Sequence, residues 1–424
     1  MRTTRSPRAG GFRQHAANHA LPVLLIGVAT VVGALAALAF QILSARALGP
    51  SEFGLLAAFL AILNVAAIAS AALQNSVAVR TAEQLAAPTV AAADKAGRRV
   101  SDATILGVGA ALVVALLTPA LARSLDTDSV IVLLAALAIP LSFWLAEDVG
   151  VLQGSGNAFG AVAWTTVSLI ARVLLVLVSM WVGFGIGGVL GSVLVATALA
   201  LVGARMTTRR MPHPRASVFN PSGLTVLALS ASMAWLINAD VVMVRAGAPG
   251  DVAGNFASAA ILVKASFMLP STLSLYLLPR FVRNRHNVSL VRTGEMLTIG
   301  ITAASGLLLT LVFWVAGDFI ANLVYGPGFE DTGTFLVPLS LVYLPWMVAQ
   351  AVLIRLTADA SRPAAVTVLV AIAVQAVGFT LALPDVTTLM WIQAAVGAAV
   401  LGAFLLLVRR ANTTTPPLQE RTLT

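Results

Sequence analysis

The chain has 424 residues, of which 59% are apolar and only 10% are charged, whereas soluble globular proteins carry about 25% charged residues. This composition excludes a disordered chain, a nucleic-acid-binding domain and an ordinary soluble enzyme, and it is typical of a polytopic membrane protein. The sequence has no cysteine, which excludes disulfides, thiolate metal sites and cysteine nucleophiles.

Twelve apolar stretches are long enough to cross a bilayer as helices, which takes about 20 residues each. Strands of a β-barrel would be half as long and would alternate polar with apolar residues, so we expect an all-α membrane protein with twelve transmembrane helices. In chain order, the expected helices cover residues 21–44, 53–78, 104–122, 129–152, 158–181, 184–204, 224–246, 253–278, 295–316, 334–356, 364–383 and 388–408.

The lysines and arginines alternate between the loops in a way that orients these helices. Of the 26 such residues, 21 lie in the N-terminal leader, in the loops after even-numbered helices or in the tail, and only Arg46, Arg123 and Arg245 lie in the opposite loops. Cytoplasmic loops are enriched in these residues. The split therefore predicts a multi-pass protein of the cell membrane with both termini in the cytoplasm. The net charge of +9 is explained by topology and by contacts with anionic membrane lipids, and no nucleic-acid partner is expected.

The two halves of the chain repeat one hairpin. Residues 46–54 read Arg-Ala-Leu-Gly-Pro-Ser-Glu-Phe-Gly, and residues 245–254 read Arg-Ala-Gly-Ala-Pro-Gly-Asp-Val-Ala-Gly, with the same Arg-to-Pro and Pro-to-acid spacings. Six helices per copy is an even number, so the two copies enter the membrane in the same direction. They are expected to form two six-helix lobes related by a pseudo-two-fold axis along the membrane normal. The predicted division is a cytoplasmic leader (1–20), an N-lobe (21–204), a cytoplasmic linker (205–223), a C-lobe (224–408) and a cytoplasmic tail (409–424).

The first hairpin, Ser-Ala-Arg-Ala-Leu-Gly-Pro-Ser-Glu-Phe-Gly at 44–54, resembles the signature of the multidrug/oligosaccharidyl-lipid/polysaccharide (MOP) flippase superfamily. It is most similar to the polysaccharide transporter (O-antigen flippase-like) branch, which moves undecaprenyl-diphosphate-linked saccharides. Three more segments resemble that family: the Leu-Gln-Gly turn at 151–157, Asn-Ala-Asp at 238–240 with residues 254–260, and Tyr-Gly-Pro-Gly-Phe at 325–329. The resemblance implies two lobes around a central cavity and alternating access.

Motifs of enzymes are missing from the sequence. It contains no Gly-x-x-x-x-Gly-Lys-[Ser/Thr] phosphate loop and no His-Glu-x-x-His metal motif. The four histidines lie in the expected leader and loops without ligand-spaced partners. We expect a protein that is not an enzyme and binds no cofactor or metal. The coupling ion, H⁺ or Na⁺, is left open.

Ionisable side chains within the spans are the main candidates for a binding site, because their burial in a membrane is costly. Arg172 and Lys264 lie mid-span, and Asp240 lies in the outer half of the seventh helix. We expect the two cations to face the cavity and receive a diphosphate, Arg172 by a bidentate contact and Lys264 as a point charge. Asp240 either neutralises one of these cations or carries the coupling ion. Alanine at either cation is expected to abolish transport while membrane levels stay normal or rise.

Further candidates lie nearer the two mouths of the cavity. Arg46 and Arg245, at the outer mouth, either bind substrate or anchor the turns in which they lie. Arg80 and Arg280, at the inner mouth, either close it or bind lipid headgroups. Asn64 either lines the cavity or makes a packing hydrogen bond.

The resemblance implies a flippase for a polyprenyl-diphosphate-linked saccharide in cell-surface polysaccharide synthesis, and the cationic candidates suit such an anionic headgroup. Its expected partners are that lipid-linked saccharide, membrane lipids, and the glycosyltransferases and polymerase of the same pathway. One alternative is a multidrug/cation antiporter of the same superfamily, although that branch needs acidic residues in the first lobe and the first helix has none. The other is a polyprenyl-dependent membrane glycosyltransferase. Such an enzyme needs acidic residues in an early outer loop, where this chain offers only Glu52.

Overall fold

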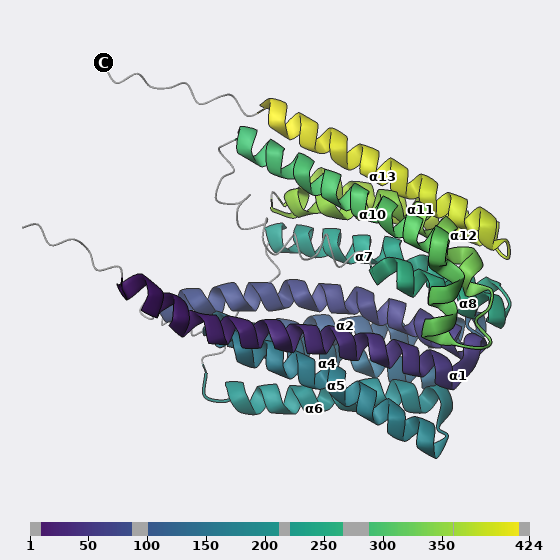
Figure 1. Cartoon of the computed structure of the whole chain (residues 1–424), viewed down its shortest axis with the longest axis horizontal. Coiled ribbons are helices and arrows are strands. Elements are labelled where there is room, and N and C mark those ends of the chain that lie inside the picture. Colours follow the sequence, from purple (N-terminus) through teal and green to yellow (C-terminus); the bar gives the residue numbers. More distant parts are fainter. Residues whose placement is uncertain (1–9, 87–100, 212–220, 266–287, 359, 415–424) are drawn as a thin grey trace, which may run out of the picture. The chain divides into compact units, whose positions relative to one another are not determined.

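The computed structural model describes residues 10–86, 101–211, 221–265, 288–358 and 360–414 (Figure 1). These residues form helices and turns, and the described ranges contain no strand. Nine of the helices in these ranges are long and apolar enough to cross a membrane, and a bent pair of shorter helices adds a tenth span if it is counted as one. The expectation of an all-α membrane protein is therefore confirmed.

The first half of the chain forms six helices in the described ranges. They are α1 (Gly10–Ala86), α2 (Asp102–Leu116), α3 (Thr118–Ser124), α4 (Ser129–Gly154), α5 (Ala158–Val182) and α6 (Gly185–Thr208). The second half forms α7 (Pro221–Gly247), α8 (Gly250–Lys264), α10 (Val288–Tyr325), α11 (Thr332–Ala358), α12 (Arg362–Ala382) and α13 (Val386–Thr414). Each of the twelve expected stretches coincides with helix, as far as the described residues extend.

Three helices differ from the expected boundaries. The first two spans are joined in one helix, α1, whose only non-helical residue is Gly49 (φ 71°, ψ 175°). Glycine adopts this left-handed φ without strain. The third span bends by 57° between α2 and α3. Pro119 in the first turn of α3 lacks the N–H that would continue α2, and its ring clashes with the carbonyl four residues earlier. Helix α10 continues past the expected end at 316 to Tyr325, with a kink at Ala316.

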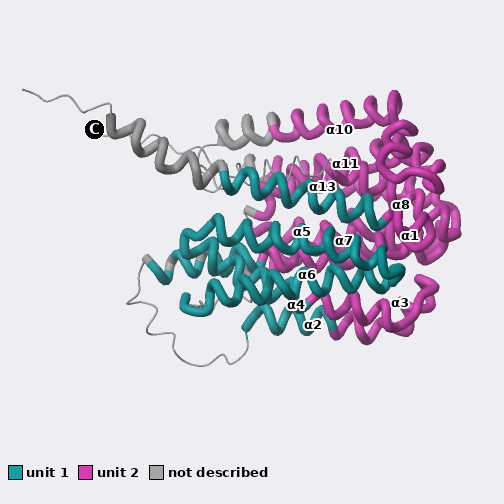
Figure 2. The backbone as a smooth tube through the Cα atoms, turned by 60° about the horizontal axis from the view of Figure 1, so that its bottom comes forward, with its two compact units in different colours: residues 1–44, 73–111, 140–216 teal, residues 45–72, 112–139, 217–424 magenta. Residues whose placement is uncertain are grey.

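The chain forms two compact units, which Figure 2 shows in two colours. Unit 1 comprises residues 1–44, 73–111 and 140–216, and unit 2 comprises residues 45–72, 112–139 and 217–424. Unit 2 thus contains segments of both sequence halves. The division into an N-lobe and a C-lobe at 205–223 stays a prediction.

Unit 1 is held together by close helix packing and buried polar contacts. Gly154 of α4 lies so close to the carbonyl oxygen of Ala78 on α1 that a Cβ atom would clash with it. Asp148 of α4 is fully buried, and the Thr208 hydroxyl of α6 donates a hydrogen bond to it at 2.8 Å. The Leu-Gln-Gly turn ends at Asn157, whose side chain accepts a bond from the Gly160 amide and begins α5. This turn is therefore a helix-packing and capping device.

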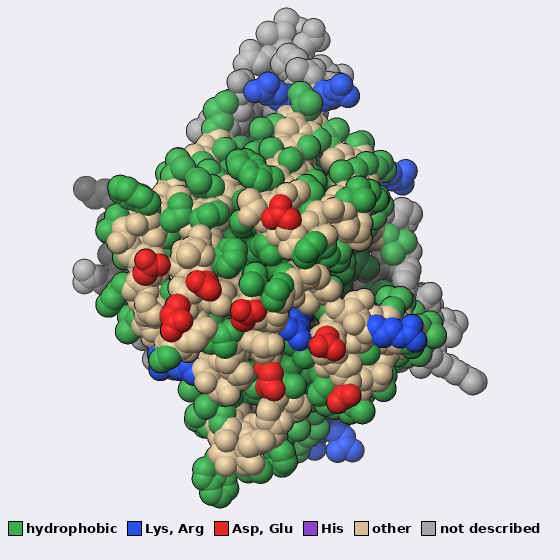
Figure 3. Space-filling view, turned by 90° about the vertical axis from the view of Figure 1, so that its right-hand side faces the viewer, with side chains coloured by type: hydrophobic (Ala, Val, Ile, Leu, Met, Phe, Trp, Pro, Cys, Tyr) green, Lys and Arg blue, Asp and Glu red, His purple; other side chains and the backbone are tan. Residues whose placement is uncertain are grey.

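Unit 2 contains the described C-terminal helices, in which α10 packs on α11, and α12 packs on α7 and α13. At one end of unit 2 lie the reversal at Gly49 and the turns that follow α3, α7, α10 and α12. We call this end the turn end. It corresponds to the right-hand side of Figure 1, and acidic side chains are spread over this face in Figure 3. Exposed acidic residues in these turns or beside them are Glu52, Asp126, Asp128, Asp251, Asp318, Glu330, Asp331 and Asp385.

Candidate functional site

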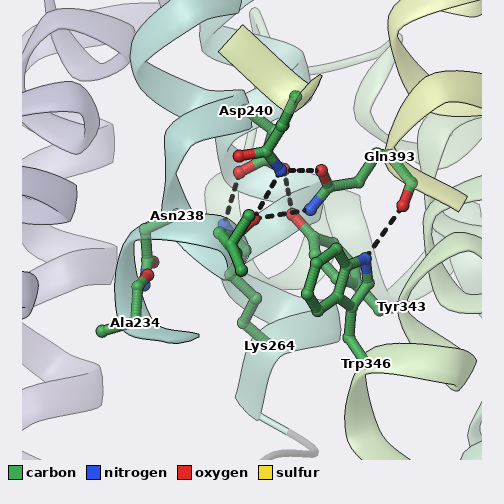
Figure 4. A network of polar contacts seen from close by, with 9 residues as sticks. Ala234, Asn238, Asp240, Lys264, Tyr343, Trp346 and Gln393 are labelled. Carbon is green, nitrogen blue, oxygen red and sulfur yellow. Dashed lines mark hydrogen bonds and ion pairs between the residues drawn. The ribbon is translucent and has the colours of Figure 1, made fainter. Parts of the chain in front are cut away.

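A buried ion pair joins two consecutive helices of unit 2. The Lys264 ammonium of α8 lies 3.0 Å from Oδ1 of Asp240 on α7, and the Asp240 side chain is fully buried while that of Lys264 is 15% exposed. The Tyr343 hydroxyl of α11 donates a hydrogen bond to the other oxygen, Oδ2 (Figure 4). The ammonium also lies 5.1 Å from the centre of the Tyr343 ring, within the range of a cation–π contact. Of the two roles expected for Asp240, the structure shows neutralisation of a cation.

Amide side chains extend this cluster to two more helices (Figure 4). The side-chain nitrogens of Gln375 on α12 and Gln393 on α13 donate to the carbonyl oxygen of Leu236, at 2.8 and 3.0 Å. Gln375 also donates to the side-chain oxygen of Gln393 at 2.5 Å. The Trp346 indole of α11 donates to the Gln393 backbone carbonyl at 3.0 Å. Four helices therefore meet through polar contacts one turn away from Asp240.

Arg172 lies on α5 in unit 1, where its Nη2 donates to the Thr197 hydroxyl of α6 at 3.3 Å. Its Nε is buried and has no hydrogen-bond partner among the described residues. In the same part of the chain, the buried hydroxyls of Ser168 and Ser179 also lack partners. Spacings of four and seven residues place these three side chains on one face of a helix. Helix α5 therefore carries a buried polar stripe with hydrogen-bonding capacity to spare.

Arg46 and Arg245 both bind the ends of other helices. Arg46 donates from Nε to the Val324 carbonyl at 3.0 Å and from Nη2 to the Leu323 carbonyl at 2.7 Å, at the end of α10. Arg245 donates from Nη2 to the carbonyl of Leu125, the residue after α3, at 3.3 Å. The last carbonyls of a helix lack intrahelical partners, and cations are favoured there. The structure thus gives each arginine an anchoring contact, and substrate binding by them stays a prediction.

The remaining candidates are less informative. Asn64 is exposed on α1, and Arg80 is half-buried on the same helix. Arg280 lies outside the described residues. Within the described ranges no group of three or more His, Asp or Glu side chains is placed to hold a metal ion.

Sequence reasoning missed Tyr343, Gln375 and Gln393, although glutamines in apolar helices are a signal that a partner is needed. Ser168 and Ser179 were missed too, because small hydroxyl residues are common in membrane helices and usually bond to their own backbone. The signal for these two is their spacing around Arg172.

No family model matches the sequence, and no curated protein matches it, but solved structures do. An inward-facing multidrug resistance MATE family transporter of the MOP superfamily matches over 90% of this chain and 95% of its own, with 14% identity and a TM-score of 0.68. The lipid II flippase MurJ, in an inward closed conformation, matches over 91% of this chain and 87% of its own, with 13% identity and a TM-score of 0.65. A MOP superfamily transporter from Pyrococcus furiosus matches over 92% of this chain and 94% of its own, with 14% identity and a TM-score of 0.54.

These similarities show that the chain has the twelve-helix, two-lobe fold of the MOP superfamily transporters. The fold class expected from the sequence is confirmed, and the fold is the one that the expected superfamily has.

Proposed function

We propose that this chain is a flippase that moves a polyprenyl-diphosphate-linked saccharide across the cell membrane by alternating access. The proposal is supported by the shared fold with MOP superfamily transporters, among them a lipid II flippase. In this proposal, residues 21–204 and 224–408 are the two lobes, and both termini are cytoplasmic. The partners are membrane lipids and the enzymes that make and polymerise the saccharide.

The observation that carries this proposal is the state of Arg172. Its guanidinium has five N–H donors. One of them binds Thr197, and the buried Nε has no partner in the part of the chain that the structure describes. Among the described residues, no carboxylate forms an ion pair with it. A cation that lies within the membrane without a counter-charge is costly, and an anionic ligand would remove the cost. A diphosphate suits it because guanidinium and phosphate oxygens form two parallel hydrogen bonds.

The polar stripe on α5 supports the same ligand class. Ser168 and Ser179 flank Arg172 and keep unused hydroxyl groups, which can donate to phosphate or sugar oxygens. Lys264 is a weaker anion ligand, because Asp240 already neutralises it. Its ammonium has three donors, so it remains a second candidate contact.

The test is the accumulation of lipid-linked saccharide on the cytoplasmic face of cells that depend on this protein. Arg172→Ala should block transport at a normal membrane level, and Arg172→Lys should restore it only in part, because lysine keeps the charge but loses the bidentate contact. The matched control is Arg209→Ala, an exposed arginine just beyond α6, which should transport normally. Normal surface polysaccharide in Arg172→Ala cells would contradict the proposed binding site.

A second function, multidrug export, is favoured by one observation. The Asp240 carboxylate is fully buried within the membrane-spanning part of unit 2, and the similar structures include a MATE family multidrug transporter. However, both Asp240 oxygens are already bound by Lys264 and Tyr343. Drug resistance in a pump-deficient strain, with no effect on lipid-linked saccharide, would identify the antiporter instead.

A further inference from the structure

The contacts of Arg46 and Arg245 are equivalent under the internal repeat. Adding 199 to the number of Arg46 gives Arg245, and adding 199 to the number of Leu125 gives Val324. Arg46 of the first half binds the carbonyl of Val324 in the second half, and Arg245 of the second half binds the carbonyl of Leu125 in the first. This reciprocity is the mark of a two-fold interface, in which a contact from i to j is matched by one from j to i.

The backbones of the two hairpins touch between these arginines. A Cβ atom added to Gly54 of α1 would lie 2.9 Å from the backbone nitrogen of Gly254 on α8, and one added to Gly254 would clash with the carbonyl oxygen of Pro50. Glycines allow such close approach between membrane helices. The turn end of unit 2 is thus closed by a seam in which the first and second sequence halves are in direct contact.

An aromatic cluster closes the same seam. The Phe53 ring of α1 lies 5.9 Å from the rings of Tyr325 and Phe329, which follow each other around the turn after α10. All three side chains are buried. Separating the sequence halves at this end therefore breaks the arginine contacts, the glycine contact and the aromatic cluster together.

We propose that Arg46 and Arg245 are a reciprocal pair of gate residues that hold the outer end of the transport path closed. The inference rests on the proposed transport function, since only a protein that alternates between two states needs to open this end. Each arginine binds backbone carbonyls of the opposite half, so opening to the outside must break both contacts. The turn end carries few lysines and arginines, as an outer face does under the positive-inside rule.

The two gate residues are unequal in the closed state. With the described residues, Arg46 makes two hydrogen bonds at 3.0 and 2.7 Å. Arg245 makes one at 3.3 Å, and its buried Nε has no partner among the same residues. A short charge-assisted bond is stronger than a long one. Release of Arg46 is therefore the larger barrier to opening, and Arg245 gives way more readily.

Thiol labelling can measure this gate directly, because the chain has no cysteine of its own. A reporter Ala257→Cys lies on α8 beside the seam, where Ala257 is fully buried. In cells, a membrane-impermeant maleimide added from outside should label it at a rate proportional to the open population. Adding Arg46→Ala should raise the labelling rate by about tenfold or more, the change expected when charge-assisted bonds are lost. Arg245→Ala should raise it less, and the double variant by about the product of the two effects.

Controls separate opening of the gate from misfolding. Arg123→Ala removes another exposed arginine of the turn end and should leave labelling unchanged, and Arg46→Lys should give an intermediate rate. A second reporter, Ala200→Cys, replaces a fully buried residue of α6 in unit 1, and only unfolding should expose it. If Arg46→Ala and Arg245→Ala label Ala257→Cys no faster than Arg123→Ala does, the gate proposal is wrong.

Disulfide cross-linking provides an independent test of the gate. The Ser51 side chain lies against the position of a Gly250 Cβ atom, so the pair Ser51→Cys with Gly250→Cys should form a disulfide when the end is closed. Arg46→Ala should slow this reaction, and the disulfide should block labelling until it is reduced. Neither readout needs a substrate. Failure of the gate therefore shows in labelling, whereas failure of the proposed function shows in the lipid-linked saccharide assay.

Discussion

Asp240 and Lys264 lie on consecutive helices, and their carboxylate and ammonium meet at 3.0 Å with the carboxylate fully buried. The pair changes what is expected of Lys264. From the sequence alone, removing a membrane cation should ease folding. In the structure, its removal leaves a buried carboxylate whose one remaining partner among the described residues is the Tyr343 hydroxyl. Loss of Lys264 should therefore lower stability as well as affect transport.

Lys264→Ala is expected to destabilise the protein by about 3–5 kcal/mol, because breaking a buried pair strands the other charge. The double variant Asp240→Asn with Lys264→Met should be more stable than Lys264→Ala, since no charge is left behind. Thermal unfolding of the three proteins in detergent measures this. Equal melting temperatures for the wild type and Lys264→Ala would show that the pair contributes nothing.

Gly254→Ala is expected to destabilise the seam at the turn end. The new methyl group would meet the Pro50 carbonyl, and relieving such an overlap costs about 1–3 kcal/mol. The control is Gly191→Ala on α6, where a Cβ atom has nothing within 4 Å and alanine favours the helix. Unfolding temperatures should fall for the first variant and stay level or rise for the second. The reverse order would refute the close contact between hairpins.

Thr208→Val removes the 2.8 Å hydrogen bond to the buried carboxylate of Asp148 and keeps the shape of the side chain. Loss of a bond to a buried charged group is expected to cost about 1.5–3 kcal/mol. Thr380→Val, on the exposed side of α12 with bonds only to its own helix, should cost little. Chemical or thermal unfolding of the purified variants measures these costs. Similar losses of unfolding free energy in both variants would argue against the Asp148 contact.

The topology predicted from the lysines and arginines can be tested by reporter fusions. Reporters at residues 215 and 287 should be cytoplasmic, and reporters at 126 and 328 should lie outside, because the charge split orients every span. The reporter is a phosphatase or a fluorescent protein, each of which is active on only one side of the membrane, so its activity shows on which side the residue lies. A single reversed reporter would mean that a span has been missed or added.

The positions of the helices along the chain could be predicted from the sequence because apolar length determines them, and for some helices the ends could be predicted as well. The expected span 158–181 is α5 (Ala158–Val182), and 364–383 is α12 (Arg362–Ala382). The bend between α2 and α3 was missed, since apolar length says nothing about direction within a span.

The site could be predicted only as single residues. Arg172, Lys264 and Asp240 are identified by their charge, but the contacts of Asp240 with Tyr343 depend on which helices are neighbours, and twelve similar apolar helices give no rule for that. The repeat pointed to Arg46 and Arg245 as equivalent positions. The repeat could not show that each arginine binds the opposite half, because that contact depends on how the helices pack.

The ion pair also bears on how the protein is made. Helices α7 and α8 are separated only by a short turn. Away from that turn, α7 carries Asp240 and α8 carries Lys264, and each of these two ionised groups would cost about 2.5–3.5 kcal/mol to insert alone. When the hairpin leaves the ribosome, Asp240 and Lys264 can neutralise each other before any later helix arrives. We therefore expect the two helices to leave the translocon together, as a single neutral hairpin, and either helix alone to be retained or inserted poorly.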